Sequence, residues 1–83
     1  MVKPFSVLRL RVLAEADSGA LLRTLERFQN LGIAPRRVIA EFTTADTMSI
    51  QVDVSGLDEA RLSLIANKLG EVPCVLRAHW CYI

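Results

Sequence analysis

The chain has 83 residues, of which 52% are hydrophobic and 23% charged, and ten basic against nine acidic side chains give a net charge of +1 at pH 7. This length predicts a single domain spanning 1–83. The balanced charge argues against a nucleic-acid-binding surface, and no apolar run approaches the roughly 20 residues of a membrane helix. A domain of this size cannot hide so much apolar surface, which predicts association with another chain.

The start of the chain, Met-Val-Lys-Pro-Phe-Ser, lacks the apolar core and cleavage site of a signal peptide, so a cytoplasmic location is expected. Cys74 and Cys81 share one strand-like run. In an extended strand they lie about 23 Å apart, which is too far for a disulfide. Both are expected to be reduced.

Residues 5–13 predict the first strand, with apolar residues on one face and Arg9 and Arg11 on the other. A helix then begins at Asp17 or Ser18 as N-cap. Its predicted apolar stripe comprises Leu21, Leu22, Leu25 and Phe28. Gly32 suits the left-handed position that ends many helices.

The second strand is predicted over 36–43, after Pro35. The third, over 48–54, alternates most clearly between apolar and polar residues. Ser55 and Asp58 resemble a capping box that opens the second helix. This helix is predicted to end at Gly70, and its stripe comprises Leu62, Ile65, Ala66 and Leu69.

Pro73 opens the last predicted strand. Simple alternation places Cys74, Leu76, Ala78 and Trp80 on its apolar face, and Val75, Arg77, His79 and Cys81 on the other. The order strand, helix, strand, strand, helix, strand favours an α+β, ferredoxin-like βαββαβ sandwich, with two helices on one face of a four-stranded antiparallel sheet. In that fold the first strand lies beside the third, so Arg9 and Arg11 face Asp53 and Gln51. Those arginines either pair across the open face or help it pack against another domain.

The residues carry no recognisable catalytic or metal-binding constellation. No Cys-x-x-Cys pair is present, which argues against an iron–sulfur or copper site. The open-face positions of the third strand, Ser49, Gln51 and Asp53, lack the aromatic side chains that stack RNA bases. His79 is the only histidine and has no partner to name. The sequence thus predicts a protein that is not an enzyme and uses no cofactor or metal.

The segment Asp17-Ser18-Gly19-Ala20-Leu21 and the helix end Leu31-Gly32-Ile33 resemble ACT domains. Within that family the chain is similar to the short regulatory small subunit of acetolactate synthase. That similarity lies in Leu25-Glu26-Arg27, Gly32-Ile33, residues 48–54, Ala66-Asn67-Lys68-Leu69 and Val72.

The resemblance implies a non-catalytic regulatory module. ACT domains usually pair into a continuous eight-stranded sheet and hold an amino-acid effector at the dimer interface. Carried over, the effector site comprises Ala16, Asp17, Ser18, Gly19 and Ala20 of one chain with Ile33 and Ala34 of the other.

Three positions depart from the ACT pattern. Ser18 replaces the usual proline, Ala16 replaces an asparagine or aspartate, and Ala34 replaces a polar residue that often begins the second strand. The backbone N–H groups of Gly19 and Ala20 would then remain to hold a carboxylate. Asp17 would either cap the helix or pair with an α-ammonium group.

Two functions follow from the resemblance. The first is a homodimeric regulatory subunit that binds a large catalytic subunit, as in acetolactate synthase. The alternative is a free-standing amino-acid sensor that uses the loop around Gly19.

Overall fold

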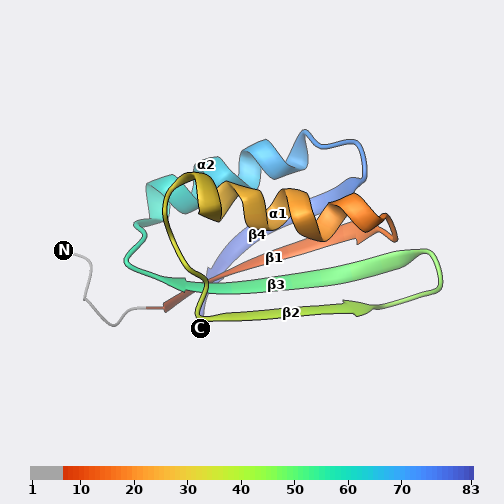
Figure 1. Ribbon diagram of the computed structural model, residues 1–83, viewed down its shortest axis with the longest axis horizontal. Coiled ribbons are helices and arrows are strands. Elements are labelled where there is room, and N and C mark those ends of the chain that lie inside the picture. The colour runs from red at the N-terminus through yellow and green to blue at the C-terminus, as the bar shows by residue number, and fades with distance from the viewer. Residues whose placement is uncertain (1–6) are drawn as a thin grey trace.

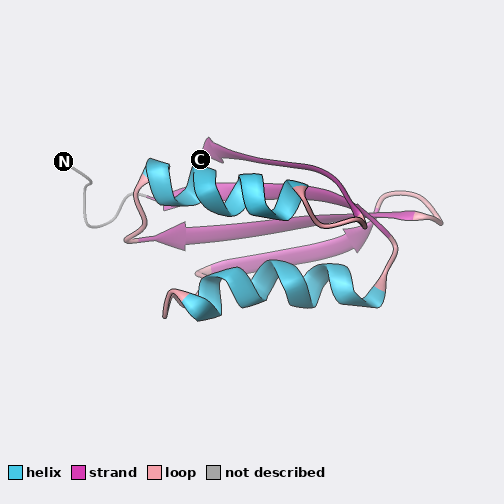
Figure 2. Ribbon diagram, turned by 90° about the horizontal axis from the view of Figure 1, so that it is seen from above, coloured by secondary structure: helices cyan, strands magenta, loops and turns pink. Residues whose placement is uncertain are grey.

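The computed structural model describes residues 7–83, and positions 5 and 6 of the predicted first strand lie outside them. Its elements, in chain order, are β1 (Val7–Glu15), α1 (Ser18–Asn30), β2 (Arg37–Phe42), β3 (Thr47–Ser55), α2 (Glu59–Gly70) and β4 (Val75–Tyr82). The strands form one antiparallel sheet in the order β2-β3-β1-β4. Both helices lie on the same side of it (Figures 1 and 2). The predicted βαββαβ sandwich is confirmed.

The core lies between the two central strands and the helices. In β1 and β3 the predicted alternation holds: Leu10, Ile50, Val52 and Val54 are fully buried. The stripe predicted for α2 is also confirmed, since all four of its members are buried. Neither α1 nor α2, the helices found among residues 7–83, is long and apolar enough to cross a lipid bilayer.

The predicted stripe of α1 is confirmed at Phe28, which is buried, and at Leu21 and Leu25, which are partly buried against the core, but not at Leu22. Ala20, Thr24 and Phe28, spaced four residues apart, are fully buried, whereas Leu22 is 61% exposed. A spacing of four keeps side chains on one helix face, and Leu22 lies about 200° around the axis from Ala20. The Thr24 hydroxyl donates to the carbonyl of Ala20 at 2.8 Å, so its burial leaves no unpaired polar atom.

The helix ends confirm some predicted caps and correct others. Asp17 is the N-cap of α1, and Gly32 follows the helix with φ +69°. Ser55 is not the cap of α2, because it ends β3, three residues too early; Asp58 caps the helix and accepts the N–H of Arg61 at 2.8 Å. Gly70 is the last residue of α2 rather than its left-handed terminator.

A β-bulge interrupts β4. Leu13 pairs with Arg77, but its neighbour Ala14 pairs with Val75, so Leu76 is an extra residue. The bulge turns Val75 inward, where it is 8% exposed, and leaves Leu76 53% exposed. The predicted alternation, which put Leu76 inside and Val75 outside, is therefore wrong at these two positions.

The edge strand β4 is tied to α2. Trp80 packs against the core, and its indole Nε1 donates to the Ser63 hydroxyl at 2.7 Å. Next to it, Tyr82 contacts the Trp80 ring edge-on and donates its hydroxyl to Glu59 at the start of α2. One edge of the sheet is thus fixed to a helix.

The opposite edge strand, β2, is left uncovered. Val38, Ala40 and Phe42 lie on the same side of the sheet as the core residues Val52 and Ile50. They are nevertheless exposed, Val38 at 39% and Phe42 at 66%. This edge lies away from β4 and α2 (Figure 1).

Candidate functional site

The loop predicted to bind an effector joins β1 to α1, and the backbone N–H groups of Gly19 and Ala20 are already used. The N–H of Gly19 donates to the Asp17 carboxylate at 2.7 Å, and that of Ala20 to the Asp17 carbonyl at 3.0 Å. The N–H of Ala16 donates to Asp46 in the β2–β3 hairpin at 2.9 Å. The N–H groups of Gly19 and Ala20, which were predicted to hold a bound carboxylate, thus have partners within the chain. An anion placed here would compete with the helix cap.

Gly19 lies close to this cap. A methyl group added at Gly19 would lie 3.1 Å from Asp17 Oδ1, which is tighter than an ordinary contact. A side chain at position 19 would therefore require the Asp17 carboxylate to shift by a few tenths of an ångström, whether or not a ligand binds. Asp17 is exposed and accepts with one oxygen, Oδ1.

The second half of the predicted site, Ile33 and Ala34, lies at the other end of α1. The helix has 13 residues, so about 20 Å of helix separates the two halves within one chain. Ile33 and Ala34 border a hollow of about 540 Å³ between α1 and β2. Its other lining residues are Leu22, Leu25, Glu26, Gln29, Gly32, Pro35 and Val38. One chain therefore does not bring the predicted effector residues together.

The open face of the sheet carries an ion pair between its two central strands. Arg9 and Asp53 are register partners, and the guanidinium donates from Nε at 2.8 Å and from Nη2 at 3.2 Å. The Asp53 side chain is only 7% exposed. Its hydrogen bond raises the pKa of Arg9 above the ordinary value. Arg9 faces Asp53 and Arg11 faces Gln51 as predicted, and the side-chain ion pair forms between Arg9 and Asp53.

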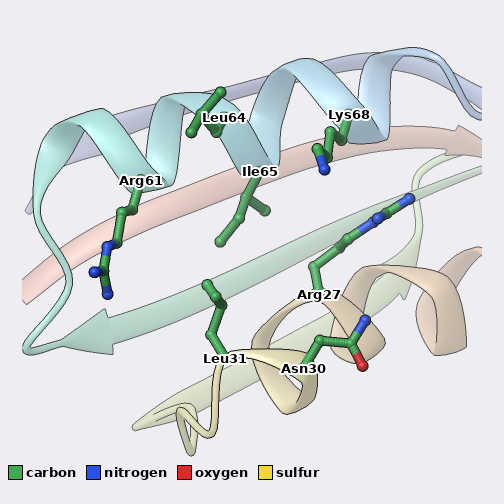
Figure 3. A pocket seen from close by; sticks show the side chains of 7 residues that line it. All are labelled: Arg27, Asn30, Leu31, Arg61, Leu64, Ile65 and Lys68. Atoms are coloured by element: carbon green, nitrogen blue, oxygen red, sulfur yellow. The ribbon is translucent and has the colours of Figure 1, made fainter.

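A second hollow, which the sequence did not suggest, lies between the two helices (Figure 3). It has a volume of about 400 Å³ and is lined by Arg27, Asn30, Leu31, Arg61, Leu64, Ile65 and Lys68. We call it the interhelical groove. Three of these side chains are cationic and none is acidic. Two helices distant in sequence supply them, although the spacing of Arg61, Ile65 and Lys68 does indicate one shared face of α2.

Within residues 7–83, no three His, Cys, Asp or Glu side chains gather closely enough to hold a metal ion. Cys74 and Cys81 are free and partly buried. His79 is exposed on the open face, opposite Arg11.

Comparison with known proteins identifies a matching sequence family and several solved structures with the same fold. The sequence matches the ACT-like domain family over residues 5–82. No curated protein sequence matches the chain significantly.

Three solved structures illustrate the fold likeness. The C-terminal domain of MgtC from Mycobacterium tuberculosis superposes with a TM-score of 0.80 at 16% identity, covering 100% of this chain and 93% of that one. The ACT domain of GTP pyrophosphokinase from Chlorobium tepidum gives 0.75 at 12% identity, covering 92% and 97%. Prephenate dehydratase from Streptococcus mutans gives 0.64 at 19% identity, covering 98% of this chain and 43% of that one. At these identities the likeness establishes the fold alone, whereas the family match covers nearly the whole sequence: the chain belongs to the ACT-like domain family.

Proposed function

We propose that this protein is a non-catalytic regulatory module that works as a homodimer joined through β2 and α1. The observation that carries this proposal is the bare apolar surface at that edge. Leu22, Val38 and Phe42 are 61%, 39% and 66% exposed, and the first two border the hollow of about 540 Å³. An uncovered edge with apolar side chains normally pairs or aggregates. ACT domains are typically regulatory modules that bind amino acids, which supports the same reading.

The backbone of β2 also suits pairing with a second copy. The N–H of Thr43, which follows β2, donates inward to Thr47 at 3.0 Å. Because N–H groups alternate in direction along an antiparallel strand, those of Val38, Ala40 and Phe42 are directed toward the open edge. Two β2 strands in antiparallel contact would extend the sheet across the dimer.

Such a dimer would reunite the two halves of the predicted effector site. A two-fold axis at the β2 edge runs the two α1 helices in opposite directions. The start of one helix, with Ala16, Asp17, Ser18, Gly19 and Ala20, then approaches the end of the other, with Ile33 and Ala34. We propose this as the effector position. Since Asp17 occupies the N–H groups of Gly19 and Ala20, an amino acid would bind weakly, with its α-ammonium group facing the Asp17 carboxylate.

We propose further that the dimer regulates a larger biosynthetic enzyme and that its partner is the catalytic subunit of an acetolactate synthase. The short sequence similarities to the small subunit of that enzyme support this identification. The occupied N–H groups of Gly19 and Ala20 support a role in assembly over a role as a free-standing sensor, which is the second candidate.

Sedimentation equilibrium tests the dimer with one variant and one matched control. Val38→Lys puts a charge on the proposed interface, and the dimer should dissociate at least about tenfold more readily. Leu76→Lys makes the same kind of change at an exposed apolar position on the opposite edge, and dimerisation should be unaffected. A wild-type chain that stays monomeric at millimolar concentration would end the dimer proposal.

The partner is tested by adding the chain to a purified large acetolactate synthase subunit. Wild-type protein should bind and change its activity, and Val38→Lys should do so less well. Calorimetry against the amino acids tests the alternative. Binding of one amino acid without any effect on the synthase would favour the free-standing sensor.

A further inference from the structure

We propose that the interhelical groove is a binding site for a small amphipathic anion, a molecule in which one carboxylate or phosphate group is joined to an apolar chain. The groove shares no residue with the hollow between α1 and β2. It is therefore separate from the proposed dimer and effector position, and its test does not depend on them.

The charge of the groove is the first argument. Arg27 from α1 and Arg61 and Lys68 from α2 place three positive charges around one hollow, in a chain whose net charge is only +1. Within residues 7–83, neither Arg27 nor Lys68 forms a salt bridge, and Arg61 makes only a 3.9 Å contact with Asp58. An anion between the helices would relieve the repulsion among these cations.

Position on the helices accounts for part of this charge. Arg27 and Lys68 lie in the last turns of α1 and α2, where cations interact favourably with the helix dipole. That effect does not require both side chains to line the same groove. It also does not apply to Arg61, which lies in the first turn of α2, where a cation is disfavoured.

The shape and apolar lining of the groove define the rest of the ligand. Ile65 and Leu31 point into the middle of the groove (Figure 3). Arg61 lies at one end of it, and Arg27 and Lys68 lie toward the other. From position 61 to position 68 the α2 axis advances about 10 Å. A volume of about 400 Å³ lies in the range of small-molecule sites, which combine an apolar lining with a few polar groups.

These features assign a role to each part of the groove. Arg27, which is partly buried, and Lys68 reach into it from opposite walls and would hold the anionic head group. Ile65 and Leu31 would contact the apolar chain. The groove contains no aromatic side chain to stack a nucleobase, which favours a simple aliphatic acid or its phosphate.

The test is an NMR titration of the ¹⁵N-labelled 83-residue chain with hexanoate, hexyl phosphate and hexanol. Amide shifts should concentrate on 27–31 and 61–68 for the two anions, at concentrations up to about 10 mM. The head group is identified by whichever anion binds more tightly. Hexanol should bind at least about tenfold more weakly than either.

Charge-removing variants distinguish binding at the groove from nonspecific binding. Arg27→Gln and Lys68→Gln should each weaken binding of the preferred anion about three- to tenfold. Arg23→Gln removes the same charge from an exposed position of α1 outside the groove, and affinity should stay unchanged. An unchanged amide spectrum away from each substitution verifies that the variant folds. Equal binding of hexanol, shifts centred elsewhere, or equal loss in Arg23→Gln would overturn the proposal.

Discussion

The two edge strands of this sheet carry similar apolar residues but differ in how far those side chains are buried. In β4, Val75 and Trp80 pack into the core, and Trp80 and Tyr82 are hydrogen-bonded to α2. In β2, Val38 and Phe42 face the helix side as well, yet both remain exposed. The difference teaches that alternation decides which face a side chain occupies, whereas burial depends on whether a helix covers that face. One edge is packed against a helix, and the other leaves apolar side chains exposed.

The largest expected contrast comes from removing one large aromatic side chain from each edge. Trp80→Ala should lower the free energy of unfolding by about 2–4 kcal/mol, because it removes core packing and a hydrogen bond. Phe42→Ala should change it by less than about 0.5 kcal/mol in the monomer. Urea unfolding followed by far-UV circular dichroism measures both. Tryptophan fluorescence cannot be used for Trp80→Ala, because Trp80 is the only tryptophan. Equal losses would remove the distinction between the edges.

The bulge predicts a second contrast, between two neighbours within β4. Val75→Ala should cost about 2 kcal/mol of unfolding free energy, because it opens a gap against the core. Leu76→Ala should cost less than about 0.5 kcal/mol, because Leu76 is more than half exposed. The same urea experiment decides between them. A larger loss at Leu76 would mean that β4 follows the simple alternation instead.

The hydrogen bond from Trp80 to Ser63 should have a smaller effect. Ser63→Ala leaves the indole N–H without its partner and should cost about 1 kcal/mol. Ser63→Thr keeps a hydroxyl group and should recover most of that loss. Urea unfolding of the two variants side by side measures the difference. Equal stability of Ser63→Ala and the wild type would show that packing alone holds Trp80.

The smallest effect concerns Tyr82, the only tyrosine. Its hydrogen bond to Glu59 raises the pKa of Tyr82 above 10.0. Because the folded pKa exceeds the ordinary value, this contact favours the folded state below pH 10 and is lost as the pH rises through the folded pKa. Tyrosinate absorbance should therefore rise at higher pH than in Glu59→Gln. A midpoint at or below 10.0 in the wild type would contradict the contact.

Most of the fold follows from local pattern. The central strands and α2 each bury one continuous face, so periodicity alone predicts them. The bulge at Leu76 escapes prediction because one extra residue reverses the alternation without a Gly or Pro signal. In α1 the predicted stripe holds at Leu21, Leu25 and Phe28 but fails at Leu22. The small Ala20 and Thr24, whose hydroxyl bonds back to the helix carbonyl, take buried positions that the leucine pattern does not indicate.

The sites are less predictable, because they depend on what the backbone already satisfies. The sequence indicates a helix start at Asp17 but not that this residue occupies the N–H groups of Gly19 and Ala20. The interhelical groove depends on how α1 and α2 face each other. From the sequence alone, Arg27 and Lys68 are therefore indistinguishable from ordinary surface charges, and only the packing of the two helices shows that they line one groove.

The extra residue in β4 also bears on how related chains vary in length. Without Leu76, Arg77 and Val75 would become consecutive partners of Leu13 and Ala14, and the ladder would run on without interruption. Since Leu76 contributes little to the interior, its loss or gain would leave every core position where it is. Relatives that lack or gain one residue at this point should keep the same interior. Alignments of their sequences should therefore place the gap at Leu76.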